Sequence, residues 1–170
     1  IAKHVVGCKR VIGTAGTDAK CQWLEANGIV DVAINYKKTP NLAKAIYKAS
    51  GKSNKSGIDL VFDNVGSTFL EAALSNLAMN AKIVLCGAIS QYNVPSGKNN
   101  SNSAVASGPR NYMNLLVKRA TMTGFVVLDY KNEFPTAISD LVQWIKEGKI
   151  QCYKEDTTHS GISNFYPALL

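Results

Sequence analysis

Short apolar runs that alternate with longer helical stretches constrain the fold of this 170-residue chain more than any other feature. The runs are rich in β-branched residues and are bounded by Gly, Asn or Asp, which is typical of strands. Strands that alternate with helices build parallel βαβ units. The expected strands are residues 10–13, 32–35, 58–63, 82–87, 121–128 and 150–153. The expected helices are residues 18–27, 41–49, 68–77, 111–119 and 133–147.

Helices should cover both faces of this sheet. The runs Ile58–Phe62 and Ile83–Cys86 are apolar on both faces, as in strands that are buried on both sides. Apolar residues of the last helix recur at a spacing of 3.6 residues, which predicts that this stripe faces the sheet. The stripe consists of Phe134, Ala137, Ile138, Leu141, Val142 and Ile145. The expected fold is therefore α/β, a Rossmann-like doubly wound parallel sheet.

Composition excludes several other classes of protein. The chain is 46% hydrophobic and 18% charged, which provides enough apolar side chains for a core and argues against disorder. Its longest apolar runs are far shorter than the roughly 20 residues of a membrane helix, so we expect no membrane partner. The four cysteines lie far apart and form no zinc-binding cluster, so we expect no metal. Reduced thiols and the lack of a signal peptide indicate a cytoplasmic protein.

Ligands of an open α/β sheet bind outside the carboxyl ends of its strands. The first strand is followed by a turn rich in Gly and Thr, with Gly16 and Thr17, and then by Lys20 in the first turn of a helix. Such a helix start offers free backbone N–H groups to a phosphate. No Asp or Glu ends the strand to select the 2′-hydroxyl of NAD, which favours NADPH. The alternative is that Lys20 belongs to a solvated helix face.

Six segments together resemble one known family. They are Ala15–Lys20, Asn35–Lys37, Phe62–Gly66, Cys86–Asn93, Gly124–Val127 and Trp144–Ile150. In this order they resemble the zinc-independent medium-chain reductases of the leukotriene B4 12-hydroxydehydrogenase/prostaglandin reductase family. Each segment alone has little specificity, whereas six at the family's spacing are a specific signal over nearly the whole chain.

The resemblance implies a role in NADPH binding for the residues that follow each strand. Lys20 would hold the 2′-phosphate, and Tyr36 would lie beside the adenosine. Asn64 would form a hydrogen bond on the nicotinamide side. The segment after the fourth strand would pass the nicotinamide ribose, and the segment after the fifth would flank the nicotinamide ring. These two segments contribute Cys86, Gly87, Ala88, Ile89, Ser90, Tyr92, Phe125, Val126 and Val127.

The resemblance also implies an activity. Enzymes of this family reduce the carbon–carbon double bond of α,β-unsaturated ketones or aldehydes by hydride transfer from NADPH. Negative charge then develops on the carbonyl oxygen of the substrate and needs a preorganised donor. Tyr92 is the candidate catalytic residue. Two alternatives stay open: Tyr92 closes a loop over the cofactor while a ribose hydroxyl donates the proton, or the protein binds NADPH without catalysis. Some members of the family have a second tyrosine, and its place by spacing is Val117 in this sequence.

The family pattern has parts that these residues do not contain. The first Rossmann strand, its Gly-rich turn and the N-terminal GroES-like domain would precede Ile1, and a last strand would follow Leu170. The first strand is central in the order 3-2-1-4-5-6, so without it two strands lack a pairing partner. We therefore expect that residues 1–170 form part of a dinucleotide-binding domain that is inactive alone, and that this part is unstable, dimerises or rearranges. A homodimer is the expected assembly.

The net charge of +7 suggests a competing function. Six lysines surround one predicted helix and could contact the phosphates of a nucleic acid. They are Lys37, Lys38, Lys44, Lys48, Lys52 and Lys55. Few aromatic residues lie among them and no recognition motif accompanies them, so a solvated lysine-rich face is the better interpretation. We expect no nucleic-acid partner.

Overall fold

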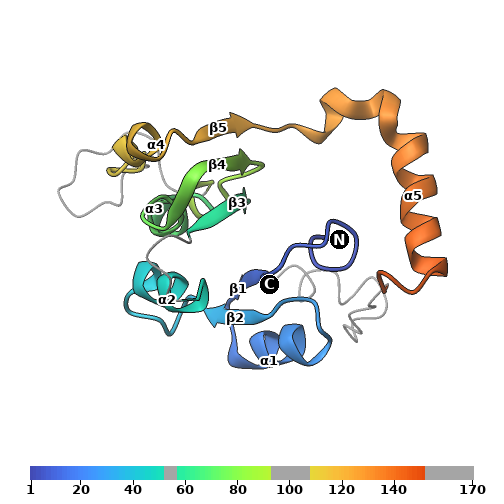
Figure 1. The fold of residues 1–170 in the computed structure, drawn as a ribbon, viewed down its shortest axis with the longest axis horizontal. Coiled ribbons are helices and arrows are strands. Elements are labelled where there is room, and N and C mark those ends of the chain that lie inside the picture. Colours follow the sequence, from blue (N-terminus) through green and yellow to red (C-terminus); the bar gives the residue numbers. More distant parts are fainter. Residues whose placement is uncertain (52–56, 93–107, 152–170) are drawn as a thin grey trace, which may run out of the picture.

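The computed structural model describes residues 1–51, 57–92 and 108–151 (Figure 1). Strands alternate with helices along this part of the chain, and all three strand pairings are parallel. This confirms the expected α/β class. The elements are β1 (Ile12–Ala15), α1 (Asp18–Ala26), β2 (Val32–Asn35), α2 (Leu42–Ala49), β3 (Ile58–Asp63), α3 (Ser67–Leu74), β4 (Leu77–Leu85), η1 (Ile89–Gln91), α4 (Met113–Lys118), β5 (Thr121–Gly124), η2 (Val127–Glu133) and α5 (Phe134–Lys146).

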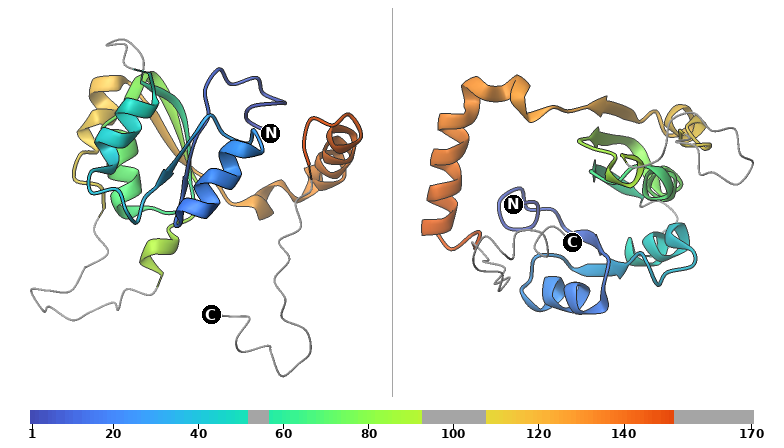
Figure 2. Two further views of the ribbon diagram at one scale, coloured as in Figure 1. Left: turned by 90° about the horizontal axis from the view of Figure 1, so that it is seen from below. Right: turned by 180° about the vertical axis from the view of Figure 1, so that it is seen from behind.

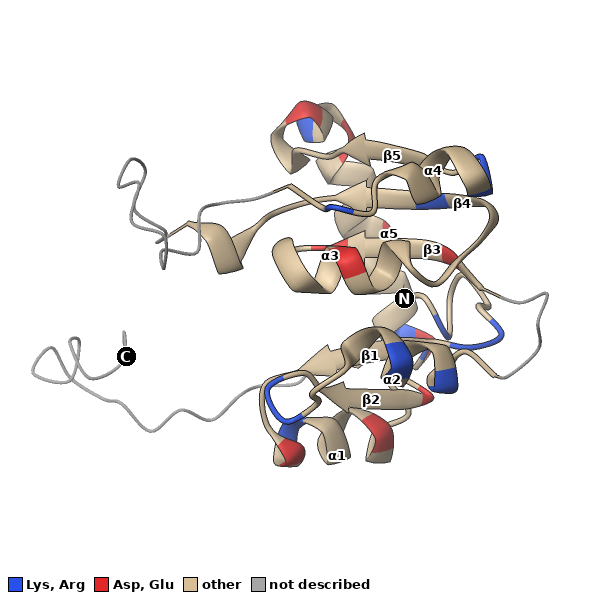
Figure 3. Cartoon of the chain, turned by 90° about the vertical axis from the view of Figure 1, so that its left-hand side faces the viewer, with Lys and Arg blue, Asp and Glu red and all other residues tan. Residues whose placement is uncertain are grey.

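The strands form two sheets instead of one. β1 pairs with β2, and β4 lies between β3 and β5. Figure 3 shows the strands one above another in the order β5, β4, β3, β1 and β2. A cavity of about 410 Å³ separates β1 from β3, and residues of both strands line it. It lies where the order 3-2-1-4-5-6 has its first strand, so the expected loss of pairing affects β1 and β3.

Two apolar clusters stabilise the described residues. The larger cluster packs α3 against β3 and β4, and it consists of Val61, Leu70, Ala73, Leu74, Leu77, Ala81 and Ile83. The smaller cluster joins β2, α2 and α3 through Ile34, Ile46, Ala49 and Ala72. The Asn76 Nδ2 atom also donates a hydrogen bond of 3.0 Å to the Ala43 carbonyl oxygen. Contacts of α2 with α3 therefore connect the two sheets.

Residues at both ends of α1 explain where this helix begins and ends. Thr17 is the N-cap, and its Oγ1 atom accepts a hydrogen bond of 3.2 Å from the Lys20 backbone N–H. After the C-cap residue Asn27, Gly28 has a φ of +64°, a conformation that glycine adopts without steric cost.

Several predicted boundaries were wrong. β1 extends to Ala15, so residues that were expected in a turn belong to the strand. β4 begins at Leu77 instead of Lys82, because α3 already ends at Leu74. β5 ends at Gly124, and the residues after it turn into η2. Of the predicted strand 150–153, the first two residues are not in a strand and the others lie outside the described residues.

The apolar stripe of α5 does not face the sheet, which contradicts the prediction. No residue of α5 is buried, and Ile138 in the middle of the stripe is 60% exposed. Figures 1 and 2 show α5 standing away from both sheets. Helical periodicity determines which side of a helix is apolar, but burial also requires a partner surface. The chain after β5 leads away from the sheet through η2, so α5 does not reach the exposed Leu60 and Phe62 of β3.

Candidate functional site

The predicted site residues follow the carboxyl ends of five parallel strands and therefore lie along one edge of the two sheets. Gly16 and Thr17 follow β1, Tyr36 follows β2, and Asn64 follows β3. The residues after β4 and β5 continue this edge. The structure brings these residues together in two groups, each called a corner below. One corner consists of the turns after β1 and β2, and the other consists of the turns after β3 and β4.

The turns after β1 and β2 approach each other at Gly16. A Cβ atom at Gly16 would lie 3.3 Å from the Tyr36 hydroxyl oxygen and 3.3 Å from the Lys37 Cε atom. Glycine therefore leaves the space that these two side chains occupy. Lys20 is exposed in the first turn of α1, four residues after Gly16 in the chain.

An acidic residue of this corner is already paired. The Asp18 carboxylate accepts hydrogen bonds from the Asn35 Nδ2 atom and from the Lys38 Nζ atom, the latter an ion pair of 2.5 Å. The hydrogen bond from Lys38 and, next, that from Asn35 lower the pKa of Asp18 below its ordinary 3.8. The same bond raises the pKa of Lys38 above 10.5. Sequence reasoning missed this contact.

Asp63 fixes the turn that carries Asn64. Its side chain is fully buried, and the Oδ1 atom accepts hydrogen bonds from the backbone N–H groups of Val65 (2.7 Å) and Gly66 (3.0 Å). The Asp63 carbonyl oxygen accepts bonds from Cys86 N–H (2.8 Å) and Gly87 N–H (3.2 Å). These bonds join the ends of β3 and β4, so Asn64 lies next to the predicted segment after β4.

Tyr92 folds back over the end of β4. Its hydroxyl oxygen accepts a hydrogen bond of 3.1 Å from the Ala88 backbone N–H. A Cβ atom at Gly87 would lie 3.0 Å from that oxygen and 3.3 Å from the Asn64 carbonyl oxygen. The Ile89 N–H also donates to the Asn64 carbonyl oxygen (3.1 Å), and the Ser90 hydroxyl donates to the Val65 carbonyl oxygen (2.5 Å). The accepted bond leaves the phenolic hydrogen of Tyr92 available to another acceptor.

The residues after β5 form an apolar edge. The Phe125 N–H donates a bond of 2.8 Å to the Leu85 carbonyl oxygen, which anchors this segment to β4. The Phe125 ring stacks on Tyr130, with ring centroids 5.1 Å apart, and lies 6.4 Å from the Phe62 ring. Val126 and Val127 are exposed. Sequence reasoning missed Tyr130, since no motif marks it.

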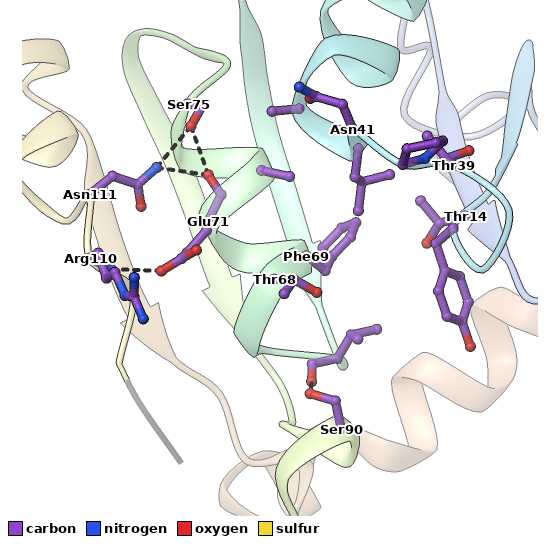
Figure 4. A pocket seen from close by; sticks show the side chains of 16 residues that line it. Thr14, Thr39, Asn41, Thr68, Phe69, Glu71, Ser75, Ser90, Arg110 and Asn111 are labelled. Carbon is purple, nitrogen blue, oxygen red and sulfur yellow. Dashed lines mark hydrogen bonds between the residues drawn. The ribbon is translucent and has the colours of Figure 1, made fainter. Parts of the chain in front are cut away.

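A cavity of about 600 Å³ extends along α3 from the residues that follow β2, β3 and β4 (Figure 4). Tyr36 and Ser90 are the predicted site residues that line it. Its other end is polar, because Asn111 Nδ2 donates to the Glu71 carbonyl oxygen (2.8 Å) and to Ser75 Oγ (2.9 Å). Sequence reasoning missed these polar residues, whose contacts join segments far apart in the chain.

Comparison with known proteins identifies the family. The family model described as zinc-binding dehydrogenase matches residues 1–144. The chain belongs to the zinc-binding dehydrogenase family. This family member is 38% identical over 165 residues to prostaglandin reductase 1 of Bos taurus, which covers 96% of the chain and 45% of that protein. It is 35% identical over 155 residues to the NADP(+)-dependent 2-alkenal reductase of Nicotiana tabacum, with coverages of 91% and 41%.

A solved structure supports the same assignment. The structure of CurA from Vibrio vulnificus in complex with NADPH is 34% identical, with a TM-score of 0.69, and the match covers 86% of this chain and 41% of that one. The expected resemblance to prostaglandin reductases and the Rossmann-like fold are therefore confirmed. The chain spans less than half the length of the curated relatives that it matches.

The name of the family raises the question of a metal. In residues 1–51, 57–92 and 108–151, no three His, Cys, Asp or Glu side chains form a group that could hold a metal ion. Cys152 lies outside this part of the chain, so the absence of a metal stays a prediction. None of the helices in the described part has the length and apolar character that crossing a membrane requires.

Proposed function

We propose that this chain is the NADPH-binding part of an oxidoreductase that reduces the carbon–carbon double bond of α,β-unsaturated ketones or aldehydes. The observation that carries the proposal is the contact of Tyr36 and Lys37 at Gly16, in the turn that leads into the helix with Lys20 in its first turn. The names of the relatives, prostaglandin reductase and 2-alkenal reductase, support the substrate class. The NADPH complex of CurA supports the cofactor.

The described residues fit the 2′-phosphate of NADPH better than the free hydroxyl of NADH. A phosphate needs cations and N–H donors, which Lys20 and the first turn of α1 supply. The Tyr36 hydroxyl adds a further donor at Gly16. Selection of NADH needs a free carboxylate, and Asp18 is instead bound to Asn35 and Lys38.

The residues after β3, β4 and β5 support reduction of an enone. Bound NADPH supplies the hydride for the β-carbon of the substrate. Asn64 offers a side-chain hydrogen bond on the nicotinamide side, while Phe125, Val126 and Val127 supply an apolar wall. The Tyr92 O–H is the donor for the charge on the carbonyl oxygen. The N–H of Ala88 binds the same hydroxyl oxygen, which orients the O–H and makes it a stronger donor.

Large side chains after β4 and β5 are exposed to solvent in this structure. They are Ile89, Tyr92, Val126 and Leu128, and Tyr92 is 68% exposed. A dry pocket strengthens hydrogen bonds to developing charge. We therefore propose that a GroES-like domain of a longer reductase forms the other wall of the substrate cleft. The homodimer, the cytoplasmic location and the absence of a nucleic-acid partner stay predictions.

The test is NADPH oxidation by the reductase that contains this chain, with methyl vinyl ketone as substrate. The Tyr92→Phe variant should lower kcat by about 100-fold, the cost of one donor to developing negative charge. Tyr47→Phe, on α2 and away from the site, is the matched control and should keep wild-type kcat. Equal rates of Tyr92→Phe and wild type would contradict the tyrosine role. NADPH binding without turnover of any enone would favour the non-catalytic alternative.

A further inference from the structure

Two consecutive lysines after β2 have different surroundings. The Lys38 ammonium is bound to the Asp18 carboxylate at 2.5 Å. The Lys37 side chain instead lies over Gly16, with its Cε and Cδ atoms 3.3 and 3.7 Å from the position of a Cβ atom there. In the described part of the chain, Lys37 takes part in no ion pair. Among the described residues, the ammonium of Lys38 is therefore paired with a carboxylate and that of Lys37 is not.

We propose that Lys37 is a second cation for the 2′-phosphate of NADPH and that Asp18 withholds Lys38 from it. This inference rests on the proposed function and deepens it. The ammonium of Lys37 is bonded to the Cε atom that lies against Gly16, so its charge stands at the turn that leads from β1 into α1. Lys20 stands in the first turn of the same helix.

The charges of this corner match those of a phosphate monoester, which carries about −1.5 to −2 at pH 7. Lys20 alone neutralises one negative charge, and Lys37 supplies the second positive charge. Asp18 would repel the phosphate if it were unpaired. Its bonds to Asn35 and Lys38 compensate that charge and hold it toward β2. NADH lacks the 2′-phosphate, so the contribution of Lys37 should affect only NADPH.

The experiment measures the dissociation constants of NADPH and NADH by titration calorimetry for the same reductase that contains this chain. Lys37→Ala should weaken NADPH binding by about tenfold or more, the usual loss for a hydrogen bond to a charged group, and should leave NADH binding unchanged. Lys37→Arg keeps the charge and should restore most of the preference. Lys48→Ala, in the last turn of α2, controls for the net charge.

The paired double variant Asp18→Asn/Lys38→Ala removes one charge of each sign. Because Lys38 is not used for the phosphate, this variant should keep the NADPH affinity within about twofold. The proposal is overturned if Lys37→Ala keeps the wild-type preference, or if the double variant or Lys48→Ala loses as much as Lys37→Ala. If the wild type itself binds no NADPH, the proposed function is overturned and the role of Lys37 with it. If the wild type binds NADPH and Lys37→Ala binds equally well, only the role of Lys37 is overturned.

Discussion

The turns after β1 and β2 can approach each other closely at Gly16 because glycine has no side chain. A Cβ atom there would approach the Tyr36 hydroxyl and the Lys37 Cε atom to 3.3 Å, which is closer than most real contacts. Gly16→Ala should therefore displace both side chains and weaken NADPH binding roughly fivefold, since modest overpacking costs about 1 kcal/mol. Titration calorimetry measures this loss. Gly108→Ala, where an added Cβ has no neighbour within 4 Å, is the control. Wild-type affinity of Gly16→Ala would contradict the importance of this contact.

The ionisation of Asp18 reports the contact with Lys38. The folded state lowers its pKa below 3.8, so the stabilising effect is present above pH 3.8 and is lost as the pH falls through the folded pKa. Lys38→Ala removes the first cause of this shift and should raise the pKa of Asp18 toward 3.8. Nuclear magnetic resonance titration of the carboxyl carbons measures it. Glu147, whose pKa is lowered chiefly by Lys149, is the internal control. An unchanged Asp18 pKa would show that Lys38 is not its partner.

The sequence suggested candidate site residues after the strands, but it did not indicate contacts between distant segments. Gly16 was a candidate because it lies in the turn after the first strand, and Asn64 because of the family resemblance; the roles of both stay predictions. The ion pair of Asp18 with Lys38 and the stacking of Phe125 on Tyr130 depend on how loops fold, which strand-end motifs do not encode. Local sequence motifs therefore indicate candidate residues, whereas the residues that contact them are determined by the tertiary fold.

At the scale of elements, α3 and α5 both carry apolar side chains but differ in burial. Leu74 at the end of α3 is 1% exposed, whereas Leu141 in the stripe of α5 is 38% exposed. Leu74→Ala should therefore lower the free energy of unfolding by about 3 kcal/mol, and Leu141→Ala by less than about 1 kcal/mol. Urea denaturation measures both variants. An equal loss would indicate that α5 packs on the sheet in solution, as the sequence periodicity predicted.

The elements also show where sequence patterns determine structure. The strands 32–35 and 58–63 were predicted with the observed bounds, because Asn35 and Asp63 end well-defined apolar runs. The start of β4 was missed, since residues 77–81 continue an apolar stretch that is equally compatible with α3. The position of α5 was missed because periodicity gives no information on the partner surface.

At the scale of the whole molecule, the unpaired edges of β1 and β3 determine how the chain behaves alone. Within the described residues each of these strands pairs on one side only, and the cavity of about 410 Å³ lies between them. Unpaired edges with apolar residues are templates for pairing with another chain. We therefore expect the apparent mass of the isolated chain to rise above that of a monomer with concentration, as sedimentation velocity would measure.

A charge on the open edge should prevent this association, because burying an unpaired ammonium between strands is costly. Leu60 lies in β3, lines the cavity and is half exposed, so Leu60→Lys should remain monomeric over the same concentrations. The control variant is Ser139→Lys, which adds the same charge at an exposed position of α5, away from both edges. This variant should associate as the wild type does. If the wild type stays monomeric throughout, the edges are closed in solution and the predicted homodimer is wrong. If Leu60→Lys associates as the wild type does, association uses another surface, for which the exposed stripe of α5 is the alternative.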